Sequence, residues 1–213
     1  MIKLAIIGAS GHGKVVADAA EQSAKWDSIV FFDDAYPKIT QNGAWPVIGN
    51  TADYIAQKDE FSGVIVAIGN NDIRLQKHAY LENSGCSLAT IIHPKSIISR
   101  YASIDRGTVV FAGAIINPYA KVGSSVIVNT GATIDHDCMI NSGAHIAPGA
   151  HLAGGVTVGR GTWIGIGVSV RQMIEIGDDI VIGAGAAVVS HLVQPGVYVG
   201  IPAKLYSVRS SSC

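Results

Sequence analysis

The sequence predicts a small α/β part followed by a parallel β-helix, and three observations carry that prediction. Residues 98–193 hold an isoleucine, valine or leucine at every sixth position without interruption. The residues between these positions include many glycines, asparagines, aspartates and prolines, which favour turns. Residues 1–92 instead alternate short apolar runs with helical stretches, the pattern of a small parallel sheet with helices on its faces.

The six-residue period of residues 98–193 is an internal repeat, and it decides the fold of this segment. It fits neither the period of a helix, about 3.6 residues, nor the two-residue alternation of a plain strand. Short strands joined by tight corners have this period, with the aliphatic side chain pointing inward and its neighbours outward. The repeat positions are Ile98, Ile104, Val110, Ile116, Val122, Val128, Ile134, Ile140, Ile146, Leu152, Val158, Ile164, Val170, Ile176, Ile182 and Val188.

This segment resembles the hexapeptide-repeat acyltransferases. The resemblance implies that each coil holds three hexads and winds left-handed, so the segment makes a little over five coils. Left-handed winding is expected from the resemblance alone, because the general rule for parallel strand connections favours right-handed crossovers. A solenoid that serves only as a scaffold or trimerisation stalk is the alternative.

Composition narrows the function classes. The 213 residues carry a net charge of −1 with 15% charged residues, so no basic face for a nucleic acid is expected. Cys86, Cys138 and Cys213 form an odd set without metal-ligand spacing, which predicts no metal site and a reducing cytoplasm. We expect neither a signal peptide nor a membrane span, because no apolar run approaches roughly 18 residues.

The elements of the α/β part follow from its apolar runs. Strands are expected at residues 3–7, 29–32, 64–68 and 87–92, and helices at residues 14–24, 51–59 and 72–83. His93-Pro94 marks the expected boundary, which gives domains of residues 1–92 and 93–213. No long linker separates them, so they are expected to pack closely.

The first strand is followed by the glycine turn Gly8-Ala9-Ser10-Gly11-His12-Gly13-Lys14. Glycines let the backbone approach a ligand, and a helix N-terminus offers free amides to a phosphate. The dinucleotide fingerprint fails on glycine spacing, and the phosphate loop of ATPases fails because Val15 replaces the hydroxyl that holds Mg²⁺. NAD binding and ATP hydrolysis are therefore excluded. A tight turn without a ligand is the alternative to phosphate or pyrophosphate binding by Ser10, Gly11, His12 and Lys14.

Polar residues also follow the second and third predicted strands, at the sheet edge where open parallel sheets bind ligands. Asp33 and Asp34 suit a ribose or sugar hydroxyl, unless they form only a solvated turn. Gly69 and Asn70 line the same crevice, or they only cap the helix that follows.

The combination of a GASGHGK turn, an FFDD strand end, an AIGNN strand end and the solenoid covers nearly the whole chain. It is similar to the bacterial sugar acetyltransferases that include the UDP-4-amino-sugar N-acetyltransferases of bacillosamine synthesis and the sialic acid O-acetyltransferases. The resemblance implies that the N-terminal domain holds a nucleotide-sugar. It also implies that acetyl-CoA lies along the solenoid between subunits of a homotrimer.

The catalytic motif of this family is a histidine followed by an acid in a corner of the solenoid, and here it is Asp135-His136-Asp137. The resemblance implies that His136 is the general base and that Asp137 raises its basicity. An imidazole tuned near neutral pH accepts the proton that an acceptor amine loses when it attacks a thioester. Asp135 is a rival partner, but its register points it away along the flat face. A histidine that merely fills a corner is the alternative.

The repeat places Gly154-Gly155 directly over His136-Asp137, one coil later. A bare backbone amide there is a donor for the thioester oxyanion, and the family uses a glycine amide at this position. His145 lies half a coil from His136, outward on the opposite face, so one chain cannot bring both histidines together. A neighbouring subunit can, and the family has a histidine matching His145 at the CoA site.

The pantetheine arm of CoA is expected along the later coils. Small residues around Ile166 and at Ala184-Gly185 leave an outer groove, and the family contacts CoA in these coils. Ordinary corner residues are the alternative. The solenoid histidines also suggest the metal site of γ-type carbonic anhydrases, which is excluded because a nucleotide-binding domain has no use there.

The sequence thus predicts a cytoplasmic acetyltransferase that uses acetyl-CoA as co-substrate and the 4-amino group of a nucleotide-linked amino-deoxysugar as acceptor. Direct attack is expected, because no cysteine or serine nucleophile is required. O-acetylation of sialic acid or another sugar hydroxyl is the alternative. A non-catalytic trimer that only binds a nucleotide-sugar is a third hypothesis.

Overall fold

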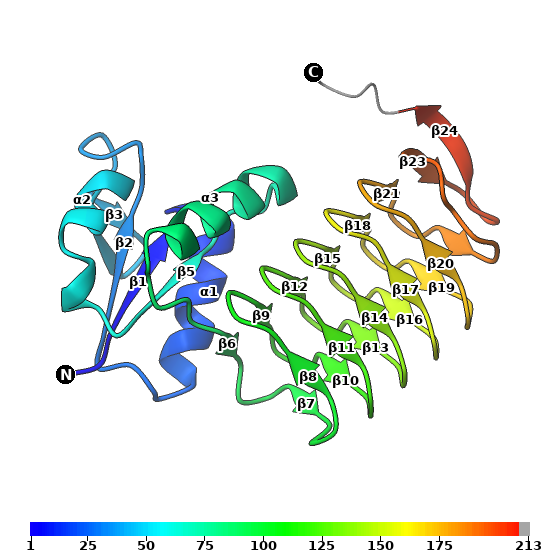
Figure 1. Cartoon of the computed structure of the whole chain (residues 1–213), viewed down its shortest axis with the longest axis horizontal. Helices are drawn as coiled ribbons and strands as arrows, with labels where there is room; N and C mark the ends of the chain where they lie inside the picture. Colours follow the sequence, from blue (N-terminus) through cyan, green and yellow to red (C-terminus); the bar gives the residue numbers. More distant parts are fainter. Residues whose placement is uncertain (209–213) are drawn as a thin grey trace.

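The computed structural model describes residues 1–208, which form an α/β part at one end of a solenoid (Figure 1). The α/β sheet has the strand order β3-β4-β2-β1-β5, in which only β3 is antiparallel to its neighbour. Its elements are β1 (Lys3–Ile7), α1 (Gly11–Gln22), β2 (Ser28–Phe32), β3 (Gln41–Asn42), β4 (Trp45–Gly49), α2 (Thr51–Ala56), the 3-10 helix η1 (Lys58–Glu60), β5 (Gly63–Val66) and α3 (Asn71–Asn83).

The elements expected in the α/β part are present, with differences at their ends. α1 begins three residues earlier than expected, because Ser10 is in the extended conformation of an N-cap and the glycine turn already belongs to the helix. The helix expected at 51–59 is α2 followed by η1. The antiparallel pair β3 and β4 was not expected; Gly43, with φ of +67°, makes the turn between these strands.

The strand expected at 87–92 is divided between the two parts of the chain. Leu88 bridges Val64 of the α/β sheet. In contrast, β6 (Ile91–Ile92) pairs with β9 in the solenoid. The change of sheet therefore occurs within three residues, and the domain division at residue 92 is kept as a prediction.

The solenoid has three parallel sheets of two-residue strands, and partner strands are offset by three hexads, as in Ile116↔Ile134. The strands are β7 (Ile97–Ile98), β8 (Ser103–Ile104), β9 (Val109–Val110), β10 (Ile115–Ile116), β11 (Lys121–Val122), β12 (Ile127–Val128), β13 (Thr133–Ile134), β14 (Met139–Ile140), β15 (His145–Ile146), β16 (His151–Leu152), β17 (Thr157–Val158), β18 (Trp163–Ile164), β19 (Ser169–Val170), β20 (Glu175–Ile176), β21 (Val181–Ile182) and β22 (Ala187–Val188), followed by the antiparallel pair β23 (Gly196–Val199) and β24 (Lys204–Val208).

The repeat positions form the core of the prism, as the six-residue period predicts. From Val110 to Val188 every one of them is at most 3% exposed. Their strand neighbours point outward, and Lys121, Met139 and Glu175 are exposed. The parallel β-helix is therefore confirmed, together with the α/β sheet.

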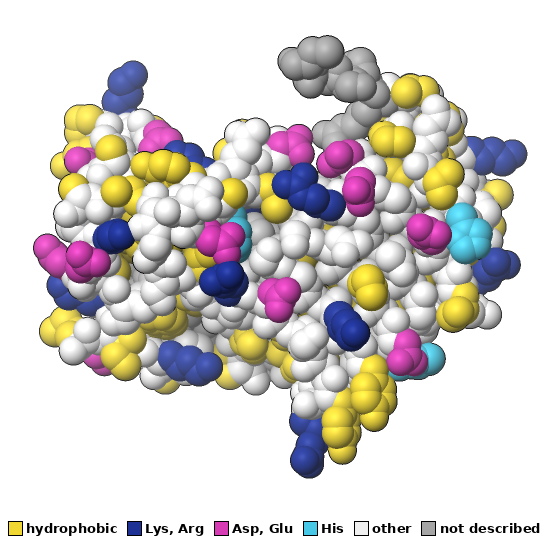
Figure 2. Space-filling model, viewed as in Figure 1, with side chains coloured by type: hydrophobic (Ala, Val, Ile, Leu, Met, Phe, Trp, Pro, Cys, Tyr) yellow, Lys and Arg dark blue, Asp and Glu magenta, His cyan; other side chains and the backbone are white. Residues whose placement is uncertain are grey.

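The α/β part packs on one face of the prism through α1 and α3. α1 lies against β6, and the first turn of α3 contacts one corner of the solenoid, where Asn71 donates to Gly161 O and Arg74 donates to Ser125 O (Figure 1). On the face drawn in Figure 2, Lys and Arg side chains are interspersed with Asp and Glu side chains rather than gathered in one basic surface. Among residues 1–208, no helix combines the length and the apolar character needed to span a membrane.

Candidate active site

His136 and Asp137 form a hydrogen-bonded pair at the solenoid corner between β13 and β14. His136 Nδ1 lies 2.8 Å from Asp137 Oδ2. Asp137 has φ of +59°, in the left-handed region that aspartate tolerates better than most residues. Both side chains are about three-fifths exposed (61% and 63%), so the pair lies at the surface of the prism.

The local charges favour protonation of His136. Its pKa is raised above 6.5, first by the hydrogen bond with Asp137 and then by the charges of Asp135 and Asp137. Asp135 makes other hydrogen bonds: its Oδ1 accepts the backbone N–H of His136 and the side-chain Nδ2–H of Asn117, both at 2.8 Å. The His136 hydrogen bond is the largest cause that lowers the pKa of Asp135. The imidazole is therefore paired with Asp137 and not with Asp135, as their registers predict.

Gly154 lies directly over His136, where the repeat of three hexads places it. A Cβ on Gly154 would stand 2.5 Å from both Cε1 and Nε2 of the imidazole, so any larger residue would displace the ring from this position. The Gly155 N–H donates to His136 O at 2.9 Å. In contrast, the Gly154 N–H has no acceptor within residues 1–208. An unpaired backbone donor beside the imidazole suits a developing oxyanion.

His145 lies on the prism face opposite this corner, as expected, but it is covered. It is 5% exposed, because the α/β part packs on this face. Its ring lies 4.2 Å from that of Trp163, and its Nε2 lies 3.0 Å from Asn129 Nδ2. The sequence predicts a histidine that points outward on this face, and the structure adds that the α/β part covers it.

His12 enters the same region from the glycine turn. Its ring meets that of Phe111 edge-on at 5.6 Å. Burial, followed by the charge of Arg74, lowers the pKa of His12 to about 4. Burial, followed by the charges of Arg74 and His12, lowers the pKa of His145 to about 3. Within residues 1–208, neither Nε2 of His12 nor Nδ1 of His145 has a hydrogen-bond partner.

The residues predicted to contact CoA lie at a different corner from His136. Ile166 and Ala184 follow β18 and β21 and occupy equivalent positions of successive coils. Ile166 is 60% exposed, and the space beside Gly185 is open. The face formed by β13, β16 and β19 separates this corner from the corner of His136. Within one chain, the structure does not bring these residues and His136 together.

The glycine turn is built for close backbone approach. Gly8 has φ of +110°, and a Cβ there would collide with Ala67 O. A Cβ on Gly13 would collide with Gly8 O and the Phe31 ring. Ser10 is the N-cap of α1 but makes no side-chain capping hydrogen bond, and the space beside Gly11 is open. The first amides of α1 are therefore accessible, and the exposed side chain of Lys14 lies nearby in sequence.

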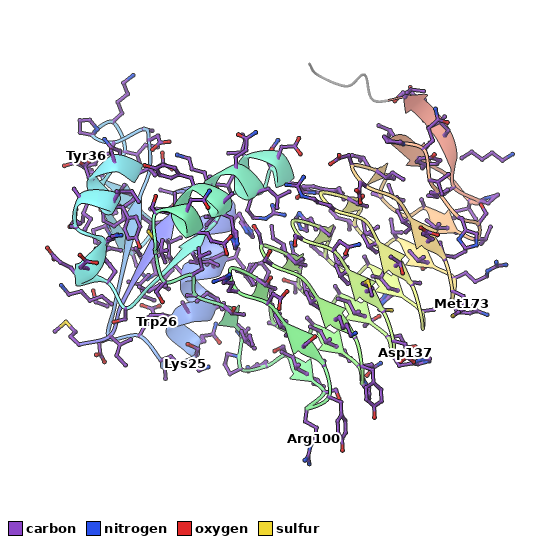
Figure 3. All side chains as sticks on the ribbon, in the orientation of Figure 1. Lys25, Trp26, Tyr36, Arg100, Asp137 and Met173 are labelled. Carbon is purple, nitrogen blue, oxygen red and sulfur yellow. The ribbon has the colours of Figure 1, made fainter. Side chains whose placement is uncertain are left out.

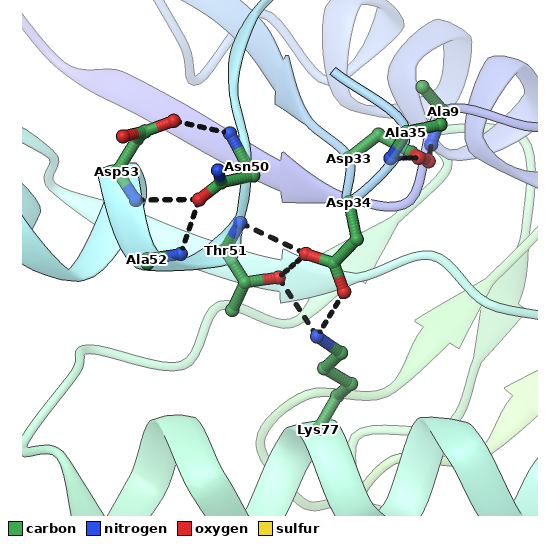
Figure 4. A network of polar contacts seen from close by, with 9 residues as sticks. All are labelled: Ala9, Asp33, Asp34, Ala35, Asn50, Thr51, Ala52, Asp53 and Lys77. Carbon is green, nitrogen blue, oxygen red and sulfur yellow. Dashed lines mark hydrogen bonds and ion pairs between the residues drawn. The ribbon is translucent and has the colours of Figure 1, made fainter. Parts of the chain in front are cut away.

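Asp33 and Asp34 have different roles at the end of β2 (Figure 4). Asp33 holds the backbone: its Oδ2 accepts the Ala9 N–H at 2.7 Å, and its Oδ1 accepts the Ala35 N–H at 2.8 Å. Asp34 accepts hydrogen bonds from the Thr51 hydroxyl at 2.6 Å and from Lys77 Nζ at 2.7 Å. The hydrogen bond from Lys77 is the largest cause that lowers the pKa of Asp34 to about 2.

A cavity of about 630 Å³ opens beside Asp34, between α2 and α3. Sequence reasoning missed most of its lining, and the only signal is that several lining residues share one face of α3. They are Asn50, Thr51, Ala52, Ile73, Gln76, Lys77 and Tyr80.

At the end of β5, the structure favours the capping role for Asn70, whose side chain accepts the Ile73 N–H at 3.0 Å. Gly69 offers its carbonyl oxygen to Arg74, a residue that sequence reasoning missed. Arg74 is 1% exposed where α3 meets the solenoid, and a lone arginine in a helix gives no signal of burial. No group of three His, Cys, Asp or Glu side chains fit to hold a metal occurs in residues 1–208.

Comparison with known proteins covers both parts of the chain. Residues 3–81 match the PglD N-terminal domain family. The acetyltransferase domain of PglB from Neisseria gonorrhoeae FA1090 is 39% identical, with a TM-score of 0.92 over 96% of this chain and 100% of that one. The same domain in complex with acetyl coenzyme A has a TM-score of 0.89 over 95% of this chain and 98% of that one.

Two named N-acetyltransferases are also similar. A variant of perosamine N-acetyltransferase from Caulobacter crescentus, in complex with CoA and GDP-perosamine, is 33% identical, with a TM-score of 0.92 over 96% of this chain and 97% of that one. UDP-N-acetylbacillosamine N-acetyltransferase of Bacillus subtilis (strain 168) is 34% identical over 112 residues, 52% of this chain. That match spans about half (51%) of the length of the curated relative. Because solved relatives match nearly the whole chain at 33% to 39% identity, the protein belongs to the family of hexapeptide-repeat sugar N-acetyltransferases.

Proposed function

We propose that this protein transfers the acetyl group of acetyl-CoA to the 4-amino group of a nucleotide-linked amino-deoxysugar. The observation that carries the proposal is the pairing of His136 Nδ1 with Asp137 at 2.8 Å, beside an unpaired Gly154 amide. The complexes of the PglB domain with acetyl coenzyme A and of the Caulobacter enzyme with CoA and GDP-perosamine support the same two substrate classes here.

In the proposed reaction, the acceptor nitrogen attacks the thioester carbonyl carbon directly. His136 Nε2 takes a proton from that nitrogen as the new N–C bond forms, and Asp137 stabilises the imidazolium. The Gly154 N–H donates to the oxyanion of the tetrahedral intermediate. The C–S bond then breaks, and the imidazolium gives its proton to the leaving thiolate, which leaves the imidazole neutral for the next turnover.

The nucleotide-sugar is proposed to bind at the carboxyl edge of the α/β sheet. The free amides at the start of α1 suit its pyrophosphate. The cavity of about 630 Å³ beside Asp34 has the size of a small-molecule site. The proposed contacts are Ser10, Gly11, His12, Lys14, Asp34, Gly69 and Asn70, with Asp33 holding the turn from behind.

Acetyl-CoA is proposed to bind along Ile166, Ala184 and Gly185 of one subunit and to reach His136 of another. The corner of His136 lies on a solenoid edge that also carries Arg100 and Met173 (Figure 3). Tyr101, Tyr119 and Met173 are 58%, 62% and 70% exposed on this edge, an apolar strip typical of protein interfaces. We therefore propose a homotrimer in which this edge meets the α/β part of the partner subunit.

The proposed compartment is one in which free thiols persist. Cys86 and Cys138 are unpaired, and the reducing cytoplasm is the compartment we propose for the reaction. Besides the nucleotide-sugar acceptor, acetyl-CoA is the one co-substrate that we propose for the reaction.

The test is a panel of acceptors, with release of free thiol from acetyl-CoA as the measurement. Turnover is expected with a UDP-, GDP- or dTDP-linked 4-amino sugar, and His136→Gln should lower kcat by about 10²-fold or more. Turnover with free sialic acid and with none of the nucleotide-linked amines would replace the proposal with O-acetylation. Tight nucleotide-sugar binding without any thiol release would indicate a non-catalytic protein.

A further inference from the structure

All five N–H donors of the buried Arg74 guanidinium are used, and all five acceptors are neutral oxygens. Nε donates to Ser125 O at 2.9 Å. One terminal nitrogen donates to Ile68 O at 3.0 Å and Gly69 O at 3.1 Å. The other donates to Asn71 Oδ1 at 2.8 Å and Gly143 O at 2.7 Å. A fork of five fixed donors is a property of arginine that lysine does not share.

These contacts join α3 to equivalent positions of successive coils. Ser125, Gly143 and Gly161 follow one another at intervals of one coil, at one corner of the prism. Arg74 binds the carbonyl oxygens of the first two, and Asn71 Nδ2 donates to Gly161 O at 2.8 Å. Three consecutive coils thus present a row of carbonyl oxygens to two side chains in the first turn of α3.

The same guanidinium holds the segment between β5 and α3, which contains the proposed substrate contacts Gly69 and Asn70. Burial lowers the pKa of Arg74 to about 10, although the charge of Asp72 opposes this, so the group stays charged at neutral pH with no carboxylate among its hydrogen-bond acceptors. Keeping an unpaired charge at 1% exposure is costly unless its donors are fully satisfied. Packed apolar side chains would join the two domains without the free-energy penalty of burying a charge. The arrangement is therefore better explained by a need for fixed geometry than by a need for stability.

We propose that Arg74, supported by Asn71, is a positioning residue that fixes residues 68–70, which contain the proposed nucleotide-sugar contacts Gly69 and Asn70, at one level along the solenoid axis. It thereby sets the position of the acceptor amine relative to the thioester. This inference rests on the proposed function. It concerns a residue that touches neither substrate and acts through the backbone that it holds. Acyl transfer needs reacting atoms about 3–3.5 Å apart, and a misplacement of about 1 Å costs roughly 10²-fold in rate.

The test compares Arg74→Lys and Asn71→Ala with the control Arg106→Gln. Arg106 also joins the solenoid to α3, through Glu82 at 2.6 Å, but this pair is exposed (64% and 40%) and lies at the far end of the helix. Each intact variant is assayed with the nucleotide-linked amine that the wild type uses. It is also assayed with hydroxylamine, a small amine that needs no contact with the α/β part, and its nucleotide-sugar Kd is measured by calorimetry.

Arg74→Lys should lower kcat for the nucleotide-linked amine by about 10²-fold, with Kd within about threefold and His136-dependent acetylation of hydroxylamine unchanged. Asn71→Ala should give the same pattern at about tenfold, and Arg106→Gln should match the wild type. Equal loss of both reactions in Arg74→Lys, or an Asn71→Ala protein with wild-type kcat, would overturn the inference. If Arg74→Lys fails to fold, Asn71→Ala decides. A wild type inactive with every nucleotide-linked amine contradicts the proposed function instead.

Discussion

The imidazole of His136 lies against the backbone of Gly154 one coil above it, with no room for a methyl group between them. Gly154→Ala would therefore push the ring away from its hydrogen bond with Asp137, since the added Cβ would stand 2.5 Å from Nε2. We expect kcat to fall by about 10²-fold, the usual contribution of a positioned base. Steady-state kinetics with the acceptor identified in the panel measure this fall.

Gly113→Asn is the matched control for that substitution. Gly113 is also a corner glycine, with φ of +72°, but its nearest contacts are at an ordinary 3.7 Å, and asparagine tolerates such a φ. It should keep wild-type kcat. Wild-type kcat in Gly154→Ala as well would show that the base does not occupy the position described here.

Asp137→Asn should move the pH dependence of kcat/KM. The reaction needs a neutral imidazole, so activity rises with pH through the pKa of His136, which Asp137 holds above 6.5. Removing the carboxylate lets that pKa fall, so the ascending limb should shift to lower pH while the plateau falls. A pH–rate profile measures both effects. An unchanged limb would mean that another group titrates.

Much of the fold was predictable because the repeat constrains every residue in the same way. The inward positions from Val110 to Val188, the corner at His136 and the stacking of Gly154 all follow from a fixed period of three hexads. A fixed period determines both where the strands and corners lie and which residues of neighbouring coils stack on one another. The family resemblance implied Asp137 as the partner of His136, and register pointed Asp135 away; the structure has the His136–Asp137 pair.

The packing of the two parts was not predictable, because it depends on single contacts between surfaces far apart in the sequence. His145 was expected to point outward from the prism, but it is 5% exposed, and nothing in its hexad indicates the α/β part that covers it. Arg74 has the sequence environment of a surface residue on α3. Asp33 and Asp34 look alike in the sequence, yet one holds the glycine turn and the other faces a cavity.

Asp34→Asn should weaken binding of the nucleotide-sugar and leave acetyl-CoA unaffected. The substitution removes the charge that faces Lys77 and the hydroxyl of Thr51 at the mouth of the cavity. We expect KM for the nucleotide-sugar to rise by about tenfold, the value of one charge-assisted hydrogen bond. The KM for acetyl-CoA, measured in the same assay, should stay within about twofold of its wild-type value. An equal rise in both KM values would place Asp34 outside the nucleotide site.

Acid should destabilise the fold through His12 and His145. Their pKa values are about 4 and about 3 in the folded chain, against 6.5 when unfolded. Below pH 6.5 the unfolded chain therefore binds more protons than the folded chain. The contribution of the two neutral histidines to the free energy of unfolding is complete above pH 6.5, and it is lost as the pH falls through about 4 for His12 and about 3 for His145. Each histidine should contribute on the order of 3 kcal/mol to this fall.

Urea unfolding at several pH values measures that loss. His145→Gln should flatten the dependence of the free energy of unfolding on pH between 6.5 and 4, because glutamine does not titrate. His151→Gln is the control, since this histidine is exposed on another face of the prism. The same slope in both variants would show that His145 is not the group responsible.

Mixed trimers should regain activity from two inactive variants. His136 and Asp137 lie on a solenoid edge away from the α/β part, whereas His12 and His145 lie where that part meets the solenoid. His12 is one of the proposed nucleotide-sugar contacts, so His12→Ala should lose turnover through loss of the acceptor. If each site takes His136 from one subunit and His12 from the next, His136→Gln and His12→Ala chains refolded together at equal amounts form intact sites in about one quarter of the interfaces. Thiol release at about one quarter of the wild-type rate is expected, after the trimer is verified by its solution mass. Verified mixed trimers without recovered activity would contradict a site shared between subunits.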